Sequence, residues 1–161
     1  ERDGSIGPHL DGLRRGTLID VEGPVGTFAL PAAFSERACL FVAGGTGIAP
    51  IRAMLMRAAA RPGLSLSLAY SARTSREFAF LRELRTLRRD RGLRLRLAAT
   101  REAPASWTHD RGRLTQTRLA TLVSTPETLC FVCGPPALVE DVPRVLMNLG
   151  IDEGRIRTEI F

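Results

Sequence analysis

The stretch CLFVAGGTGIAPIRAML, residues 39–55, places an apolar run, a glycine-rich turn and an amphipathic helical pattern in direct succession. Gly44, Gly45 and Gly47 carry no Cβ, so the backbone can approach a ligand closely. Pro50 suits the first turn of a helix, where unpaired N–H groups and the positive end of the dipole attract anions. The stretch therefore predicts either a phosphate site between a strand and a helix, or a turn that is only tightly packed.

The glycine turn does not match two common phosphate motifs. No Lys-Ser or Lys-Thr pair follows the glycines, as a P-loop requires, and Pro50 stands where the usual dinucleotide fingerprint has its third glycine. The glycine turn alone therefore does not indicate which kind of phosphate group it could bind, and the rest of the chain has to be considered.

The 161-residue chain is 44% hydrophobic and 25% charged, which is typical of a globular protein. Its net charge of +6 comes from arginine alone, since the sequence contains no lysine. We attribute this to compositional bias, because the densest arginines fall on the solvated sides of a predicted helix and strand at 82–96. Nucleic-acid binding is disfavoured, because aromatic residues make up only 6% of the chain.

The sequence has no apolar run long enough to span a membrane and does not open on a signal peptide, so we expect a cytoplasmic protein that does not bind membranes. Cys39, Cys130 and Cys133 each lie in an apolar run, which favours reduced core thiols. Cys130 and Cys133 should point to opposite faces of a strand, and further ligands at zinc spacing are lacking, so we predict no metal site.

From about residue 35 onward, five strand-like runs alternate with helical patterns. This alternation predicts an α/β fold, in which helices flank a five-stranded parallel sheet. We expect strands at 39–43, 65–71, 93–99, 128–134 and 155–161. Helices are expected from Pro50, after the capping box of Thr74 and Glu77, at 114–123 and at 136–149.

The first 34 residues do not show the alternation of strand and helix patterns that the rest of the chain shows. GTLIDVEGPVGTFAL, residues 16–30, predicts two short antiparallel strands around a Gly-Pro turn. A segment of this size cannot bury its own core, so we expect it to pack on the α/β domain or to be the end of a larger barrel.

Polar residues follow the predicted second and third strands, where ligands of parallel sheets bind. Ser71 and Arg73 follow the second strand, and Thr100 and Arg101 follow the third. A hydroxyl with a guanidinium suits a phosphate monoester, because arginine presents a planar fork of donors. Each of these arginines taken singly is equally compatible with an ordinary loop residue of an arginine-rich chain.

Four motifs in order, VAGGTGIAP, YSAR with EFAFLREL, CGPPALVEDV and the closing TEIF, resemble the pyridine-nucleotide half of the ferredoxin-NADP reductase family. The segment GSIGPHLDGLRRGTLIDVEGPVGTF resembles the end of that family's flavin-binding barrel. The resemblance covers essentially the whole chain. It implies a Rossmann-like nucleotide domain at 35–161, and at 1–34 the C-terminal part of a barrel whose beginning is absent.

The resemblance also implies site residues. The NAD(P) pyrophosphate would be held by Gly44, Gly45, Thr46, Gly47, Ile48, Ala49 and Pro50. Ser71, Arg73, Thr100 and Arg101 would surround the adenosine ribose, with NADP favoured over NAD. The turn of Cys133, Gly134, Pro135 and Pro136 would lie beside the nicotinamide. Cys133 would shape the hydride-transfer geometry, with Glu159 and Phe161 against the flavin.

The flavin, FAD or FMN, would contact Gly4, Ser5, Ile6 and Gly7 through its phosphates. The family has a serine where this chain has Gly7, and its Arg-x-Tyr-Ser/Thr flavin motif does not occur in this sequence. Two functions follow. The first is an NAD(P)H-dependent flavin oxidoreductase that passes electrons to an iron–sulfur, haem or oxygenase partner; the second is a nucleotide-binding module without chemistry of its own.

Overall fold

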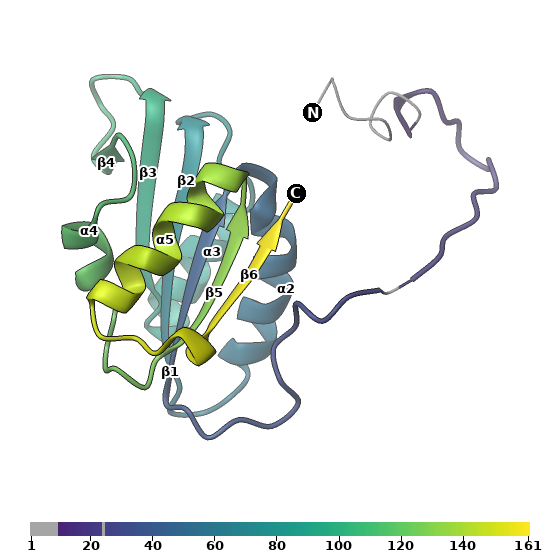
Figure 1. Cartoon of the computed structure of the whole chain (residues 1–161). Helices are drawn as coiled ribbons and strands as arrows, with labels where there is room; N and C mark the ends of the chain where they lie inside the picture. Colours follow the sequence, from purple (N-terminus) through teal and green to yellow (C-terminus); the bar gives the residue numbers. More distant parts are fainter. Residues whose placement is uncertain (1–9, 24) are drawn as a thin grey trace.

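The computed structural model describes residues 10–23 and 25–161, and its centre is a parallel sheet (Figure 1). The sheet has six strands in the order β4-β3-β2-β1-β5-β6. Their bounds are β1 Ala38–Gly44, β2 Ser65–Thr74, β3 Arg94–Glu102, β4 Asp110–Arg111, β5 Leu129–Gly134 and β6 Ile156–Ile160. The five predicted strands are confirmed, and the two-residue β4 extends the sheet by one strand at its edge.

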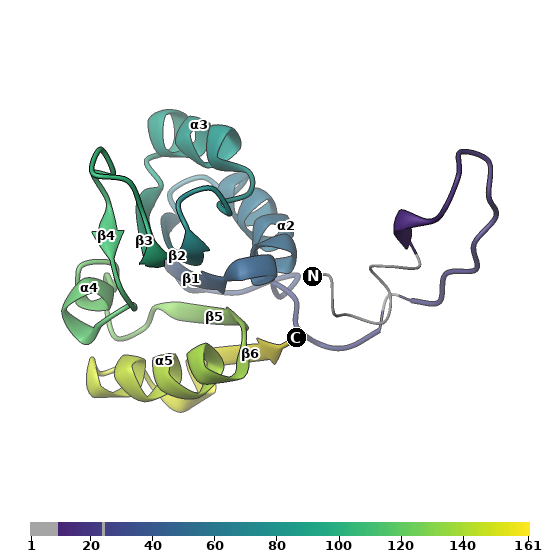
Figure 2. The same cartoon turned by 90° about the horizontal axis from the view of Figure 1, so that it is seen from above.

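Helices cover both faces of the sheet, as the alternating pattern predicted (Figure 2). Helices α2 (Ile48–Ala59) and α3 (Leu81–Arg91) lie on one face, and α4 (Gln116–Ala120) and α5 (Pro136–Asn148) lie on the other. The short 3₁₀ turns η1 (Gly45–Gly47) and η2 (Glu153–Arg155) precede α2 and β6. No helix in the described ranges has the length and apolarity that a membrane crossing requires.

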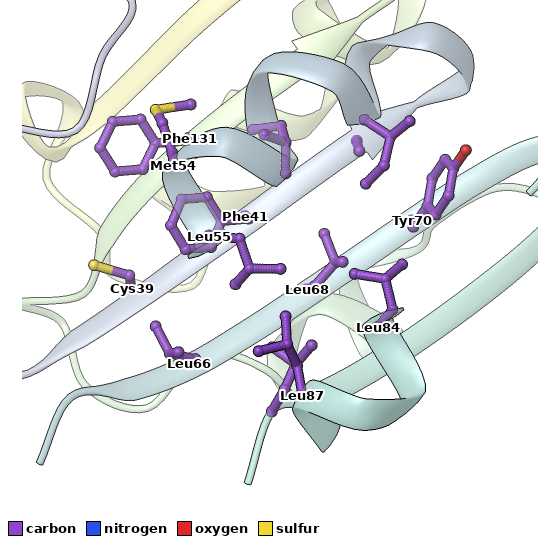
Figure 3. Close-up of a cluster of buried hydrophobic side chains, with 14 of the residues drawn as sticks. Cys39, Phe41, Met54, Leu55, Leu66, Leu68, Tyr70, Leu84, Leu87 and Phe131 are labelled. Atoms are coloured by element: carbon purple, nitrogen blue, oxygen red, sulfur yellow. The ribbon is translucent and has the colours of Figure 1, made fainter. Parts of the chain in front are cut away.

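The alternation of side chains along each strand divides the core in two. Phe41 and Phe131, from the neighbouring strands β1 and β5, stack with ring centroids 5.4 Å apart on the α2 and α3 side. Figure 3 shows them together with Leu55 of α2. Leu40 and Val132 point the other way, towards α4 and α5. Cys130 and Cys133 belong to different clusters, which confirms that they face opposite sides of β5.

The prediction of an antiparallel pair at 16–30 is wrong for the described part of that segment, which contains no strand. Residues 12–23 and 25–27 run away from the sheet (Figure 1), so their backbone groups have no neighbouring strand to pair with. Leu18 and Val21 are 96% and 82% exposed. The segment therefore has apolar side chains but no core of its own.

Residues 28–36 behave differently, because they pack on the α/β domain. Phe28 meets Phe131 edge to face, with ring centroids 6.0 Å apart, and Leu30 is buried. Arg61 lies over the ring of Phe34 and donates to its carbonyl oxygen at 2.7 Å. These contacts hold the segment against α2 and β5.

The expected start of the second helix is also corrected. Thr74 and Glu77 do interact, since the Thr74 hydroxyl donates to Glu77 Oε1 at 3.3 Å, but α3 begins only at Leu81. The Ala79 N–H donates to the hydroxyl of Tyr70 at 3.2 Å, and Phe80 adopts a left-handed φ of 59°. Because of these two features, the helical conformation begins only after Phe80.

Candidate functional site

The glycine turn joins β1 to α2 at the carboxyl edge of the sheet. Gly45 has a φ of +55°, which only glycine adopts without strain, and it turns the chain from the strand into η1. Helix α2 then begins at Ile48, so Pro50 is its third residue. No side chain caps this helix, the Ile48 N–H donates to the Gly45 carbonyl oxygen within η1, and Pro50 has no N–H, so an anion would meet mainly the positive end of the helix dipole.

Three further glycines of the site lie where a side chain would meet neighbouring atoms. A Cβ on Gly47 would lie 2.3 Å from the Cys133 carbonyl oxygen, and one on Gly44 would lie 2.9 Å from Pro135 Cδ. A Cβ on Gly134 would lie 3.2 Å from the Gly44 backbone. The turns that follow β1 and β5 are therefore in backbone contact, at the point where the order of the strands reverses. Open parallel sheets bind ligands at this point.

A cavity of about 830 Å³ lies along this edge of the sheet. Its size is within the range of small-molecule sites. The predicted residues that line it are Gly44, Gly45, Thr46, Ile48, Ala49, Ser71, Arg73, Thr100, Arg101, Pro135 and Phe161. Those that do not line it are Gly47, Pro50, Cys133, Gly134, Pro136 and Glu159. Gly4, Ser5, Ile6 and Gly7 lie outside the described residues.

Further residues that were not predicted as site residues also line the cavity, and all of them except Arg113 and Leu114 lie within the motifs YSAR, EFAFLREL and CGPPALVEDV. They are Tyr70, Ala72, Glu77, Ala79, Phe80, Arg113, Leu114, Ala137, Leu138, Asp141 and Val142. Arg113 lies in a segment that resembles a plain surface loop, and Asp141 belongs to the polar face of α5. No sequence signal identified Arg113, because the two-residue strand β4, which ends at Arg111, was not predicted.

Arginine dominates the charge of the cavity. Arg73, Arg101 and Arg113 line it and are exposed, whereas its carboxylates are Glu77 and Asp141. Glu77 Oε2 also accepts a hydrogen bond from the Arg73 backbone N–H at 3.2 Å, which shapes the turn after β2. An anionic group would therefore meet a net positive wall.

The two predicted hydroxyls bridge neighbouring strands. Ser71 Oγ donates to the Ala43 carbonyl oxygen at 3.4 Å, and Thr100 Oγ1 donates to the Ala72 carbonyl oxygen at 3.2 Å. Each hydroxyl oxygen keeps its lone pairs as acceptors, and its hydrogen can rotate towards a ligand. These residues can therefore both support the edge of the sheet and contact a bound molecule.

The loop that carries Arg113 is held by Arg118 of α4. Arg118 donates to the carbonyl oxygens of Arg111, at 2.8 Å, and of Arg113. Asp110 of β4 lies 3.6 Å from Arg118 and accepts from Arg96 Nε at 2.5 Å. Because the backbone on both sides of Gly112 is tied down, the position of the Arg113 Cα is well defined at the mouth of the cavity.

Cys133 lies under the turn rather than in the cavity. Its side chain is 1% exposed, and the neighbouring strand places Glu159 opposite it in register. Burial raises the pKa of the Cys133 thiol to about 11, and the negative charge of Glu159 adds to the increase. The thiol is therefore neutral at physiological pH and is not a nucleophile there.

We expect all three cysteines to resist alkylation in the folded protein. Burial raises the pKa of Cys39 and of Cys130 to about 12, and that of Cys133 to about 11. At pH 8 the thiolate fraction of Cys133 is then about one in a thousand. Mass spectrometry after iodoacetamide should find them unlabelled in buffer and labelled in urea. Rapid native labelling of Cys133 would contradict the buried position.

The C-terminal Phe161 reaches back to the glycine turn. A Cβ on Gly47 would lie 2.9 Å from Phe161 Cε1, and the Phe161 ring lines the cavity while remaining 49% exposed. Glu159 is exposed on β6 and does not line the cavity. Of the three residues predicted to act near the reacting ring, Phe161 alone therefore lines the cavity directly.

Comparisons with known proteins show the family of the chain. The family model described as "Oxidoreductase NAD-binding domain" matches residues 41–144. The flavohemoprotein of Rhodopirellula baltica is 31% identical, over 99% of this chain and 41% of its own length. The glycine betaine monooxygenase reductase subunit of Chromohalobacter salexigens is also 31% identical, over 99% of this chain and 45% of its own length. The chain thus spans less than half the length of these curated relatives.

A solved structure also resembles this chain. The flavohem-like FAD/NAD binding domain of nitric oxide dioxygenase from Vibrio cholerae is 26% identical with a TM-score of 0.73. The match covers 86% of this chain and 56% of that one. The expected resemblance is therefore confirmed, and the chain belongs to the oxidoreductase NAD-binding domain family of ferredoxin reductase-like flavoenzymes.

Proposed function

We propose that this chain is the nucleotide-binding part of an NAD(P)H-dependent flavin reductase. The observation that carries the proposal is the cavity at the carboxyl edge of the sheet, where an uncapped helix start and three arginines face one volume. The glycine turn suits a pyrophosphate, and the arginines suit a further phosphate. When bound, NAD(P)H supplies a hydride and FAD or FMN accepts it.

The residues of this chain would bind and orient the dinucleotide. The glycine turn and the positive end of α2 would hold the pyrophosphate between the ends of β1 and β5. Ser71 and Thr100 would contact the adenosine ribose from the ends of β2 and β3. The close contact between Gly44 and Gly134 would keep the nicotinamide half out of the space between the two turns.

Cys133, Glu159 and Phe161 would act on the reacting end. Phe161 would lie against the ring system that approaches Gly47 and would exclude water from it. Cys133 would support the turn beneath the nicotinamide as a neutral thiol, and Glu159 would face the flavin side from β6. All three would position groups, because hydride transfer depends chiefly on a short and well-oriented approach of the two rings.

We further propose a preference for NADPH, supported by the arginines at the carboxyl ends of β2 and β3 and by the arginine after β4. Residues 1–34 would belong to the flavin-binding barrel, with Gly4, Ser5, Ile6 and Gly7 near the flavin phosphates. The electrons would pass on to a haem, iron–sulfur or oxygenase component. The named relatives include a flavohemoprotein and a monooxygenase reductase subunit, which supports such a partner.

The test is anaerobic reduction of flavin in the protein as its gene encodes it. On mixing with NADPH, we expect the flavin absorbance band to bleach in a single-turnover experiment. A protein that shows no flavin absorbance, even after FAD or FMN is added, would contradict the reductase. That result would instead favour a nucleotide-binding module without chemistry of its own.

A further inference from the structure

An ion pair between two elements lies in the wall of the cavity. Arg113, from the loop between β4 and α4, and Asp141, from the second turn of α5, both line the cavity. Arg113 Nη1 is 3.8 Å from Asp141 Oδ2, and the two side chains are 80% and 55% exposed. A pair this long and this exposed is weak, so a stronger anion can displace the carboxylate.

Asp141 has a second partner that keeps it in place. Arg144, one turn further along α5, donates from Nη2 to Asp141 Oδ1 at 3.0 Å. Arg144 Nε also donates to the Glu140 carbonyl oxygen at 3.0 Å, which fixes the guanidinium against the helix. When Arg113 leaves, the Asp141 carboxylate therefore stays paired with Arg144 at the lining of the cavity.

Arg113 is the movable member of the pair. Its backbone is fixed, because Arg118 donates to its carbonyl oxygen. Its side chain is exposed, so the guanidinium can turn from Asp141 to a ligand without any change in the fold. A phosphate that binds Arg113 must replace the Asp141 carboxylate and must also remain near its negative charge.

We propose that Asp141 is a specificity-determining residue, which competes with the 2′-phosphate of an NADP-type ligand for Arg113. This inference rests on the proposed function. A ligand without the 2′-phosphate does not bind Arg113, so the competition does not affect its affinity. Asp141 therefore reduces the preference for NADPH that the three arginines would otherwise create.

Calorimetric titration of the chain with NADP⁺ and with NAD⁺ tests the competition. In D141N, we expect the affinity for NADP⁺ to rise about three- to tenfold and that for NAD⁺ to change less than about twofold. The affinity of R113Q for NADP⁺ should equal that of the double variant R113Q/D141N. E140Q is the matched control, because Glu140 is exposed on the same turn but does not line the cavity.

Four outcomes would overturn the competition. These are an unchanged affinity for NADP⁺ in D141N, an equal gain for NAD⁺, a gain that persists without Arg113, and the same gain in E140Q. The last three would indicate a general effect of charge instead of competition for Arg113. A wild-type chain that binds neither nucleotide would contradict the proposed function itself, whereas a wild-type chain that binds NADP⁺ without any effect of D141N would contradict Asp141 alone.

Discussion

Replacing Gly47 with alanine is expected to weaken nucleotide binding by more than about tenfold and to lower the free energy of unfolding by about 1–3 kcal/mol. The new Cβ would lie 2.3 Å from the carbonyl oxygen and 2.6 Å from the carbonyl carbon of Cys133. Both atoms belong to the backbone of a buried central strand, which cannot move aside cheaply. The glycine turn must therefore shift, and the start of α2 shifts with it.

The expected losses in G47A result from a steric clash and not from the backbone conformation. Gly47 has a φ of −58°, which alanine adopts freely. Gly63 offers the opposite control, because its φ is +73° but nothing lies within 4 Å of an added Cβ. G63A should lose about 1–2 kcal/mol through strain and keep its affinity for nucleotide. Urea unfolding and calorimetry measure both quantities, and a G47A variant with wild-type stability and affinity would contradict the backbone contact.

Replacing Arg73 or Arg101 with alanine should raise the KM for NADPH about 10- to 100-fold and that for NADH less than about threefold. Hydrogen bonds from a guanidinium to a phosphate are strong, because both groups are charged. Both side chains line the cavity from the ends of neighbouring strands, where the 2′-phosphate is proposed to bind. Steady-state kinetics of the intact reductase with each nucleotide provides the measurement.

Arg76 is the matched control for these variants. It lies in the turn directly after β2, three residues from Arg73, and is exposed, but it does not line the cavity. R76A should leave both KM values unchanged, which separates direct contact from the general field of an arginine-rich surface. Equal losses for NADPH and NADH in R73A and R101A would remove the proposed preference for NADPH.

The main architecture could be predicted because it depends on local patterns. Apolar runs such as 39–43 and 128–134 are buried on both faces, so they have to be central strands of a parallel sheet. The glycine turn was predictable for a similar reason, because the helix pattern begins immediately after it. The start of α2 was misplaced by two residues, since Pro50 can occupy any position of the first turn.

The rest depended on contacts between distant segments. The left-handed φ of Phe80 follows from packing around Tyr70, and nothing in the local sequence predicts it. The expected strands at 16–30 needed a partner that the described chain does not supply. Arg113 and Asp141 reach one cavity only because Arg118 ties the loop before α4. Such residues are found only when the fold is known.

The most direct test of the site is to map a nucleotide onto the chain. Titration of the ¹⁵N-labelled chain with NADP⁺ should shift the amide signals of residues 44–46, 48–49, 71–73, 100–101 and 113–114, which line the cavity. Signals from α3, whose arginines lie away from this edge, should not move. A titration that shifts no signals, or shifts only those of α3, would contradict a nucleotide site at the carboxyl edge of the sheet.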